Sequence, residues 1–207
     1  MEAKHAALII VDLQPDFMPG GALPVAEGDR IVEPVSRLVR SANFRKVIAT
    51  QDWHPPGHVS FASSHPGRRP FESIELYGRP QMLWPDHCVQ GTAGAELHRA
   101  LSTDSIAAII RKGSDPMCDS YSGFRNNWNE DGKRPPTGLA RLLKELGIAE
   151  VFLCGLARDY CVHWTARDAV EAGFRAKVLW DLTRPVDPAS DEDVRRDLLA
   201  LGVDIIS

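Results

Sequence analysis

The chain has 207 residues, of which 43% are hydrophobic and 25% charged, as is ordinary for a globular protein of one large domain. The net charge of -4 at pH 7 argues against nucleic acid as a main partner, because phosphate binding needs a basic surface. No apolar run approaches the roughly 20 residues of a membrane span. We therefore expect one cytoplasmic domain over residues 1–207, without a nucleic-acid or membrane partner. The sequence leaves open whether the chain forms a homo-oligomer.

Six short apolar runs predict strands. They are Ala6–Val11, Lys46–Thr50, Ile106–Ile110, Val151–Cys154, Ala176–Trp180 and Val203–Ile206. All but the last are apolar throughout or nearly so, which is typical of strands that are covered on both faces.

Helical patterns separate most of these runs. They cover Ile31–Ala42, Gly138–Leu146, Tyr160–Ala172 and Asp191–Leu201, and a glycine ends each of the last three. The alternation predicts an α/β fold, a three-layer α/β/α arrangement around a six-stranded, mainly parallel sheet. Two long segments without periodicity, Gln51 to about Gly94 and Gly113–Pro136, follow the second and third strands. Ligands of open α/β sheets bind at such carboxyl ends, so both loops are expected to be functional.

Three polar residues stand at or just past strand ends: Asp12, Lys112 and Cys161. Parallel strands deliver their ends to one edge, where these side chains would form a nucleophile with an acid–base partner and a cation. The ammonium and a helix N-terminus would each lower the pKa of the thiol. If the first, third and fourth strands are neighbours, the strand order is 2-1-3-4-5-6. A loop cap, a surface charge and a packed thiol are the alternative interpretations of the three residues.

A second group of residues has the composition of a metal site. Asp52 and His54 alternate at a strand end and so point to one side, and His87 lies in the segment LWPDHC. Two histidines and one carboxylate leave room for water and substrate around a metal ion. Loop histidines are, however, more often solvated than ligating.

Five motifs together resemble the nicotinamidases of the isochorismatase-like cysteine hydrolases, over nearly the whole chain from Ala6 to about Asp204. They are VDLQPDF (Val11–Phe17), TQDWHPPGHVSFA (Thr50–Ala62), WPDHCVQGT (Trp84–Thr92), RKGSDPMCDSYSGF (Arg111–Phe124) and GLARDYCV (Gly155–Val162). The resemblance implies hydrolysis of nicotinamide to nicotinate and ammonia, extending to pyrazinamide, through a thioester on cysteine and within pyridine nucleotide salvage. The partner it implies is a small heteroaromatic amide.

The resemblance also assigns residues to roles. The triad would be Cys161, Asp12 and Lys112. One divalent ion (Zn, Mn or Fe) would be held by Asp52, His54 and His87, with Ser60 at or near the shell through water. A cis peptide at Leu156–Ala157 would aim the N–H groups of Ala157 and Cys161 at one point as an oxyanion hole. Phe17, Trp84 and Tyr121 would wall an aromatic slot.

Some residues depart from the pattern or leave a choice open. Arg158 stands where the resemblance leads us to expect Thr, and Asp16 would either orient a metal-bound water or cap its loop. Cys118 and Cys154 are interpreted as structural, and Cys88, beside a proposed ligand, as either a bystander or a member of the metal shell. Alternative functions are hydrolysis of another carboxamide or carbamoyl C–N bond, attack by a metal-bound water, and an inactive ligand-binding protein.

Overall fold

The computed structural model describes residues 3–41 and 43–207. Six parallel strands form one sheet in the order β5-β2-β1-β6-β7-β8. Their bounds are β1 Ala3–Val11, β2 Phe44–Asp52, β5 Ile106–Lys112, β6 Glu150–Leu156, β7 Arg175–Arg184 and β8 Asp204–Ile206. The predicted α/β class and parallel sheet are confirmed.

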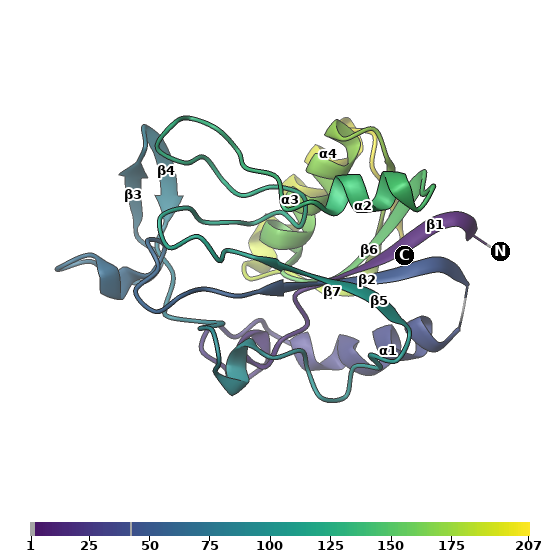
Figure 1. The fold of residues 1–207 in the computed structure, drawn as a ribbon. Helices are drawn as coiled ribbons and strands as arrows, with labels where there is room; N and C mark the ends of the chain where they lie inside the picture. The colour runs from purple at the N-terminus through teal and green to yellow at the C-terminus, as the bar shows by residue number, and fades with distance from the viewer. Residues whose placement is uncertain (1–2, 42) are drawn as a thin grey trace.

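Helices cover both faces of this sheet, with α1 on one side and α2, α3 and α4 on the other (Figure 1). Their bounds are α1 Val32–Arg40, α2 Leu139–Glu145, α3 His163–Glu171 and α4 Asp191–Ala200. The predicted end of the first helix, Ala42, lies outside the described residues. Successive β1 side chains enter opposite cores, Ile9 toward α2–α4 and Leu8 and Ile10 toward α1. Within residues 3–41 and 43–207, none of the helices has the length and apolarity to span a membrane.

The predicted strand order is wrong. The third strand along the main sheet, β5, lies at the edge next to β2, so that β1 is flanked by β2 and β6. The prediction assumed that strands contributing to one site must be neighbours. In the register of β2 and β5, however, Lys112 lies opposite Asp52. The long stem of the lysine carries its charge past β2, and the carboxyl ends of β1 and β6 come within its reach.

A small antiparallel hairpin, absent from the sequence prediction, interrupts the first long loop. It consists of β3 Ser73–Leu76 and β4 Arg79–Met82. Hydrogen bonds from Tyr77 Oη to Met117 O (2.9 Å) and from Gln81 Nε2 to Asp119 Oδ2 (2.7 Å) tie it to the second long loop. Figure 1 shows the hairpin at the same end of the molecule as this loop. The two irregular segments therefore support one another above the carboxyl ends of the strands.

Gly155 lets β6 pass close to β1 just before the candidate site. The pairing of β6 with β7 shifts register between Leu153 and Gly155, and Gly155 has φ +112°. A Cβ at this position would collide with the backbone carbonyl of Val11, the residue before Asp12. Glycine is required here because both its φ and its close backbone approach exclude a side chain.

We therefore expect Gly155→Ala to lower the free energy of unfolding by about 1–3 kcal/mol more than Gly202→Ala does. Gly202 also has a positive φ, +80°, but an added Cβ there would have no neighbour within 4 Å. Urea denaturation of both variants measures the difference, which isolates the contact with β1 from the strain of the backbone angle. Equal losses would show that the approach of β6 to β1 relaxes without cost.

Candidate active site

One buried ammonium group joins the predicted catalytic and metal-binding residues. Lys112 Nζ lies 3.0 Å from Asp12 Oδ2, 3.0 Å from Asp52 Oδ1 and 3.4 Å from Cys161 Sγ. It also donates a hydrogen bond of 3.0 Å to the backbone carbonyl of Ser120. Burial opposes the charged form of Lys112, but the carboxylates of Asp12 and Asp52 raise its pKa well above the usual value. The lysine therefore stays charged between two carboxylates and a thiol.

Asp12 is held by the backbone turn at the end of β1 and by one hydroxyl. Its φ is +46°, its Oδ1 accepts a hydrogen bond of 2.6 Å from Thr50 Oγ1, and Thr50 Oγ1 in turn accepts one of 3.2 Å from Asp12 N. Oδ2 pairs with the charge of Lys112 but has no hydrogen-bond partner among the described residues. Burial raises the pKa of Asp12, and Lys112 opposes this rise. An oxygen without a hydrogen bond, on a carboxyl group with a raised pKa, is suited to accept a proton.

Cys161 lies in a π-helical turn, Arg158–Val162, which precedes α3. The sequence predicted an α-helix from Tyr160, so the first turn of that helix has a different geometry. Cys161 is 6% exposed and lines a cavity. Burial raises the pKa of Cys161 well above its usual value, although Lys112 lowers it. The expected lowering by the ammonium is present, but desolvation of the thiolate outweighs it, so the net shift of the thiol pKa is upward.

The turn before Cys161 contains the expected cis peptide bond between Leu156 and Ala157. The Ala157 N–H donates no hydrogen bond to another described residue, whereas its carbonyl accepts from Tyr160 N (3.2 Å) and Val162 N (3.0 Å). Ala157 and Cys161 both line the same cavity. A free amide beside the thiol is what binding of a developing oxyanion requires.

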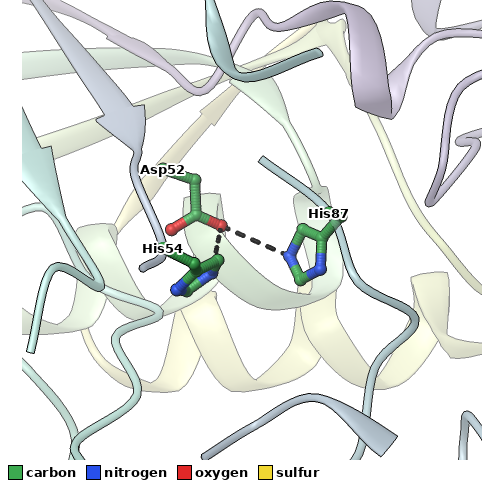
Figure 2. Close-up of side chains that lie close together, drawn as sticks. All are labelled: Asp52, His54 and His87. Carbon is green, nitrogen blue, oxygen red and sulfur yellow. Dashed lines mark ion pairs between the residues drawn. The ribbon is translucent and has the colours of Figure 1, made fainter. Parts of the chain in front are cut away.

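Asp52, His54 and His87 converge on one another (Figure 2), and all three line the same cavity as Cys161. Asp52 Oδ2 lies 3.2 Å from His54 Nε2 and 3.5 Å from His87 Nε2. Nδ1 of His54 lies 2.9 Å from the backbone carbonyl of Gly113, and Nδ1 of His87 lies 2.8 Å from that of Pro85. A carbonyl can only accept, so each Nδ1 carries the proton and each Nε2 presents its lone pair to the centre. These three residues therefore fit a divalent metal ion.

A neighbouring group, His54, His58 and Asp119, also places potential ligand atoms within 4.8 Å of one another. His58 Nδ1 is hydrogen bonded to Ser60 Oγ (2.8 Å), and burial lowers the pKa of His58 to about 4. His58 is therefore neutral at pH 7. The predicted place of Ser60 near the metal shell stays a prediction, since its hydroxyl is hydrogen bonded to His58.

Both halves of the site open onto one cavity with aromatic walls. The three predicted slot residues, Phe17, Trp84 and Tyr121, line it together with Cys161 and the three potential metal ligands. Trp84 Nε1 donates a hydrogen bond of 3.1 Å to Tyr121 Oη, which fixes the two rings at an interplanar angle of 87°.

The sequence prediction missed other residues of the wall: Leu23, Asp119, Ser120, Tyr160 and Val186. Tyr160 directly precedes the nucleophile candidate, so its position was a usable signal. Val186 lies in a loop far from any motif and gave none.

Asp16 and the remaining cysteines have structural surroundings. Asp16 Oδ2 accepts a hydrogen bond of 2.7 Å from Cys88 N, so Asp16 caps its loop and ties it to the segment that carries His87. Burial raises the pKa of Cys88, Cys118 and Cys154, and Cys154 lies in the interior of β6. All four cysteines are free, and none belongs to a group of potential metal ligands within the described part of the chain.

A thiol, a carboxylate and an ammonium at the carboxyl ends of a parallel sheet are the groups that a cysteine hydrolase needs as nucleophile, base and cation. The chain belongs to the isochorismatase family, whose domain model matches residues 6–207. A curated nicotinamidase from Acinetobacter baylyi is 46% identical over 207 residues, covering 100% of this chain and 94% of the relative.

Three solved structures superpose on nearly the whole chain. A nicotinamidase/pyrazinamidase from Acinetobacter baumanii has a TM-score of 0.93 at 43% identity, covering 100% of this chain and 98% of the other. A protein from L. infantum in complex with nicotinate has a TM-score of 0.85 at 41% identity, with coverages of 99% and 93%. A Pyrococcus horikoshii pyrazinamidase in complex with zinc has a TM-score of 0.78 at 36% identity, with coverages of 98% and 99%.

We expect Lys112→Met to shift alkylation of Cys161 by iodoacetamide to higher pH. The ammonium opposes the rise in the thiol pKa, so its removal leaves burial and the two carboxylates to raise the pKa further. Labelling of the Cys161 peptide against pH, measured by mass spectrometry, gives the profile. Lys177→Met, at a partly exposed site, is the control. An unchanged profile for Lys112→Met would show that the ammonium does not act on the thiol.

We also expect the affinity of the site for Zn²⁺ to fall as the pH falls. Burial lowers the pKa of His54, but Asp52 raises it to a net value above its usual one. Protons therefore compete with the metal from a pH above about 6.5 downward. Isothermal titration of metal-free protein between pH 8 and pH 5 measures the effect. His54→Ala would remove most of the affinity at every pH, and His98→Ala, outside the site, would leave the wild-type curve unchanged.

Proposed function

We propose that this protein is a nicotinamidase, one isochorismatase-like domain that hydrolyses nicotinamide to nicotinate and ammonia through a thioester on Cys161. The main support for this proposal is that Cys161 and the three potential metal ligands line one cavity, which also has aromatic walls. A flat heteroaromatic amide spans these two ends, with its ring nitrogen toward one and its carboxamide toward the other. The name and identity of the Acinetobacter baylyi relative support this substrate.

The proposed cofactor is one divalent ion, Zn, Mn or Fe, held by Asp52, His54 and His87. Imidazole nitrogen with one carboxylate suits all three metals, and the zinc complex of the Pyrococcus horikoshii pyrazinamidase supports the first. When bound, the ion would supply a Lewis acid that holds the pyridine nitrogen of the substrate. His54 and His87 keep the required tautomer through Gly113 O and Pro85 O.

The proposed reaction begins with transfer of the thiol proton to Asp12. The Cys161 sulfur attacks the carboxamide carbon of the substrate. The carbonyl oxygen of the carboxamide becomes an oxyanion, which the N–H groups of Ala157 and Cys161 hold. Lys112 holds the thiolate and Asp12 in place and neutralises charge that cannot reach water. Asp12 then gives its proton to the departing nitrogen, and ammonia leaves as the C–N bond breaks.

Hydrolysis of the thioester repeats these steps with water. Asp12 removes a proton from the water as its oxygen attacks the acyl carbon, and the same two amides hold the oxyanion. Breaking of the C–S bond releases nicotinic acid, which gives its proton to solvent or ammonia and becomes nicotinate, and the sulfur recovers the proton from Asp12. Pyrazinamide has the same outline with a second ring nitrogen, so we propose that it is a substrate too.

We expect Cys161→Ala to lower kcat for nicotinamide by at least about a thousandfold with little change in zinc content. The metal ligands do not include the sulfur, so the variant separates the nucleophile from the metal site. Ammonia release measures turnover, and Cys154→Ala is the control because that thiol lies inside β6. Retention of a substantial share of kcat by Cys161→Ala would transfer attack to a metal-bound water and contradict the thioester.

The role of the metal is tested by comparing nicotinamide with benzamide, which has the same shape but no ring nitrogen. If the ion orients the pyridine ring, chelation or His54→Ala lowers kcat/KM for nicotinamide by about a hundredfold. Benzamide is then a poor substrate both before and after. A parallel loss for the two amides would contradict ring binding and point to a different carboxamide or carbamoyl substrate.

A further inference from the structure

Arg158, the first residue of the π-helical turn, is buried, and its side chain is satisfied entirely by one distant segment. Nε donates to Thr183 Oγ1 (2.8 Å), and Nη2 donates to Thr183 O (2.8 Å) and Trp180 O (3.1 Å). Nη1 pairs with Asp191 Oδ2 at 2.5 Å, and the guanidinium lies 4.0 Å from the ring centre of Trp180. Arg158 thus fastens the turn to the end of β7 and the start of α4.

Asp159, the next residue, contacts the same segment between those two points. Its Oδ1 accepts a hydrogen bond from Val186 N (2.9 Å) and its Oδ2 accepts one from Asp187 N (2.9 Å). Val186 is part of the wall of the substrate cavity. Two adjacent side chains of the turn therefore hold both the end of β7 and the loop that carries one side of the cavity.

We propose that Arg158 and Asp159 form a clamp that fixes the oxyanion hole relative to the Val186 wall, and that Arg158 is a positioning residue for hydrolysis of a flat aromatic carboxamide. Ala157 immediately precedes Arg158, and Cys161 follows three residues later, so the clamp is attached between the two oxyanion donors. The metal ligands and the rings of Phe17 and Trp84 come from other segments. This inference rests on the proposed function and adds to it a residue that does not touch the substrate.

Two small ligands separate positioning of the oxyanion hole from binding of the ring. Pyridine-3-carbaldehyde adds the Cys161 thiol across its carbonyl group: the C–S bond forms, the C=O π bond breaks, and the oxygen is held by the two amides. The thiol proton passes to that oxygen or stays on Asp12, and no group leaves. The second ligand, 3-methylpyridine, has the same ring with no oxygen and reports on ring contacts alone.

In the zinc-loaded full chain, we expect Arg158→Thr to weaken inhibition by the aldehyde about tenfold or more. The reason is that the N–H groups of Ala157 and Cys161 would no longer be fixed in the positions that bind the oxygen. Affinity for 3-methylpyridine should stay near the wild-type value, and kcat for nicotinamide should fall more than KM changes. Arg158→Lys, which retains the charge but cannot reach all its partners, should show the same selectivity with a smaller loss. This second variant carries the test if Arg158→Thr does not fold.

Arg134→Thr is the matched control. Arg134 forms a two-pronged pair with buried Asp168 (2.7 and 2.8 Å) and lies over Trp128 and Trp164, so these contacts are with α3 and the second long loop and not with the turn itself. The Arg134→Thr variant should have a lower melting temperature but an unchanged ratio of the affinities for the aldehyde and for 3-methylpyridine. If Arg158→Thr behaves in this way, or weakens both ligands equally, the clamp is merely structural and the inference is overturned. A wild-type protein that neither hydrolyses nicotinamide nor binds the aldehyde would instead overturn the proposed function, and the inference with it.

Discussion

The site depends on one buried charge, the ammonium of Lys112. It lies at 3.0 Å from a carboxylate of each half of the site, Asp12 on the catalytic side and Asp52 on the metal side. Without this cation, two carboxylates would be buried without compensation at a large desolvation cost. With it, Asp52 keeps one oxygen on Lys112 and turns the other toward His54 and His87. The nucleophile and the metal ligands are therefore parts of one electrostatic unit.

The sheet explains how this unit forms from distant segments. Asp12 follows β1, Lys112 ends β5 and the turn of Cys161 follows β6, while Asp52 ends β2 between β1 and β5. The lysine lies beside Asp52 in the register and extends beyond it. The three residues of a triad therefore do not have to come from adjacent strands when one of them has a long side chain. The predicted strand order was wrong because it assumed that they do.

Much of the fold and site could be predicted from local patterns, and the failures have physical causes. Continuous apolar runs marked the strands, and the polar residues at their ends marked Asp12, Lys112 and Cys161. The direction of the Cys161 pKa could not be read in this way, since it depends on how completely the folded chain excludes water. Val186 and the clamp at Arg158 were hidden because their contacts join segments about 25 residues apart without a shared motif.

The proposed mechanism requires that Cys161 form a covalent acyl bond with the carbonyl carbon of the substrate. Rapid mixing of the zinc-loaded protein with nicotinamide, acid quenching, and mass spectrometry of the Cys161 peptide test it most directly. We expect a nicotinoyl adduct on this peptide within the first turnover, and this adduct should disappear as nicotinate accumulates. Steady release of nicotinate with no adduct on Cys161 at any quench time, under conditions that preserve a synthetic thioester, would contradict it.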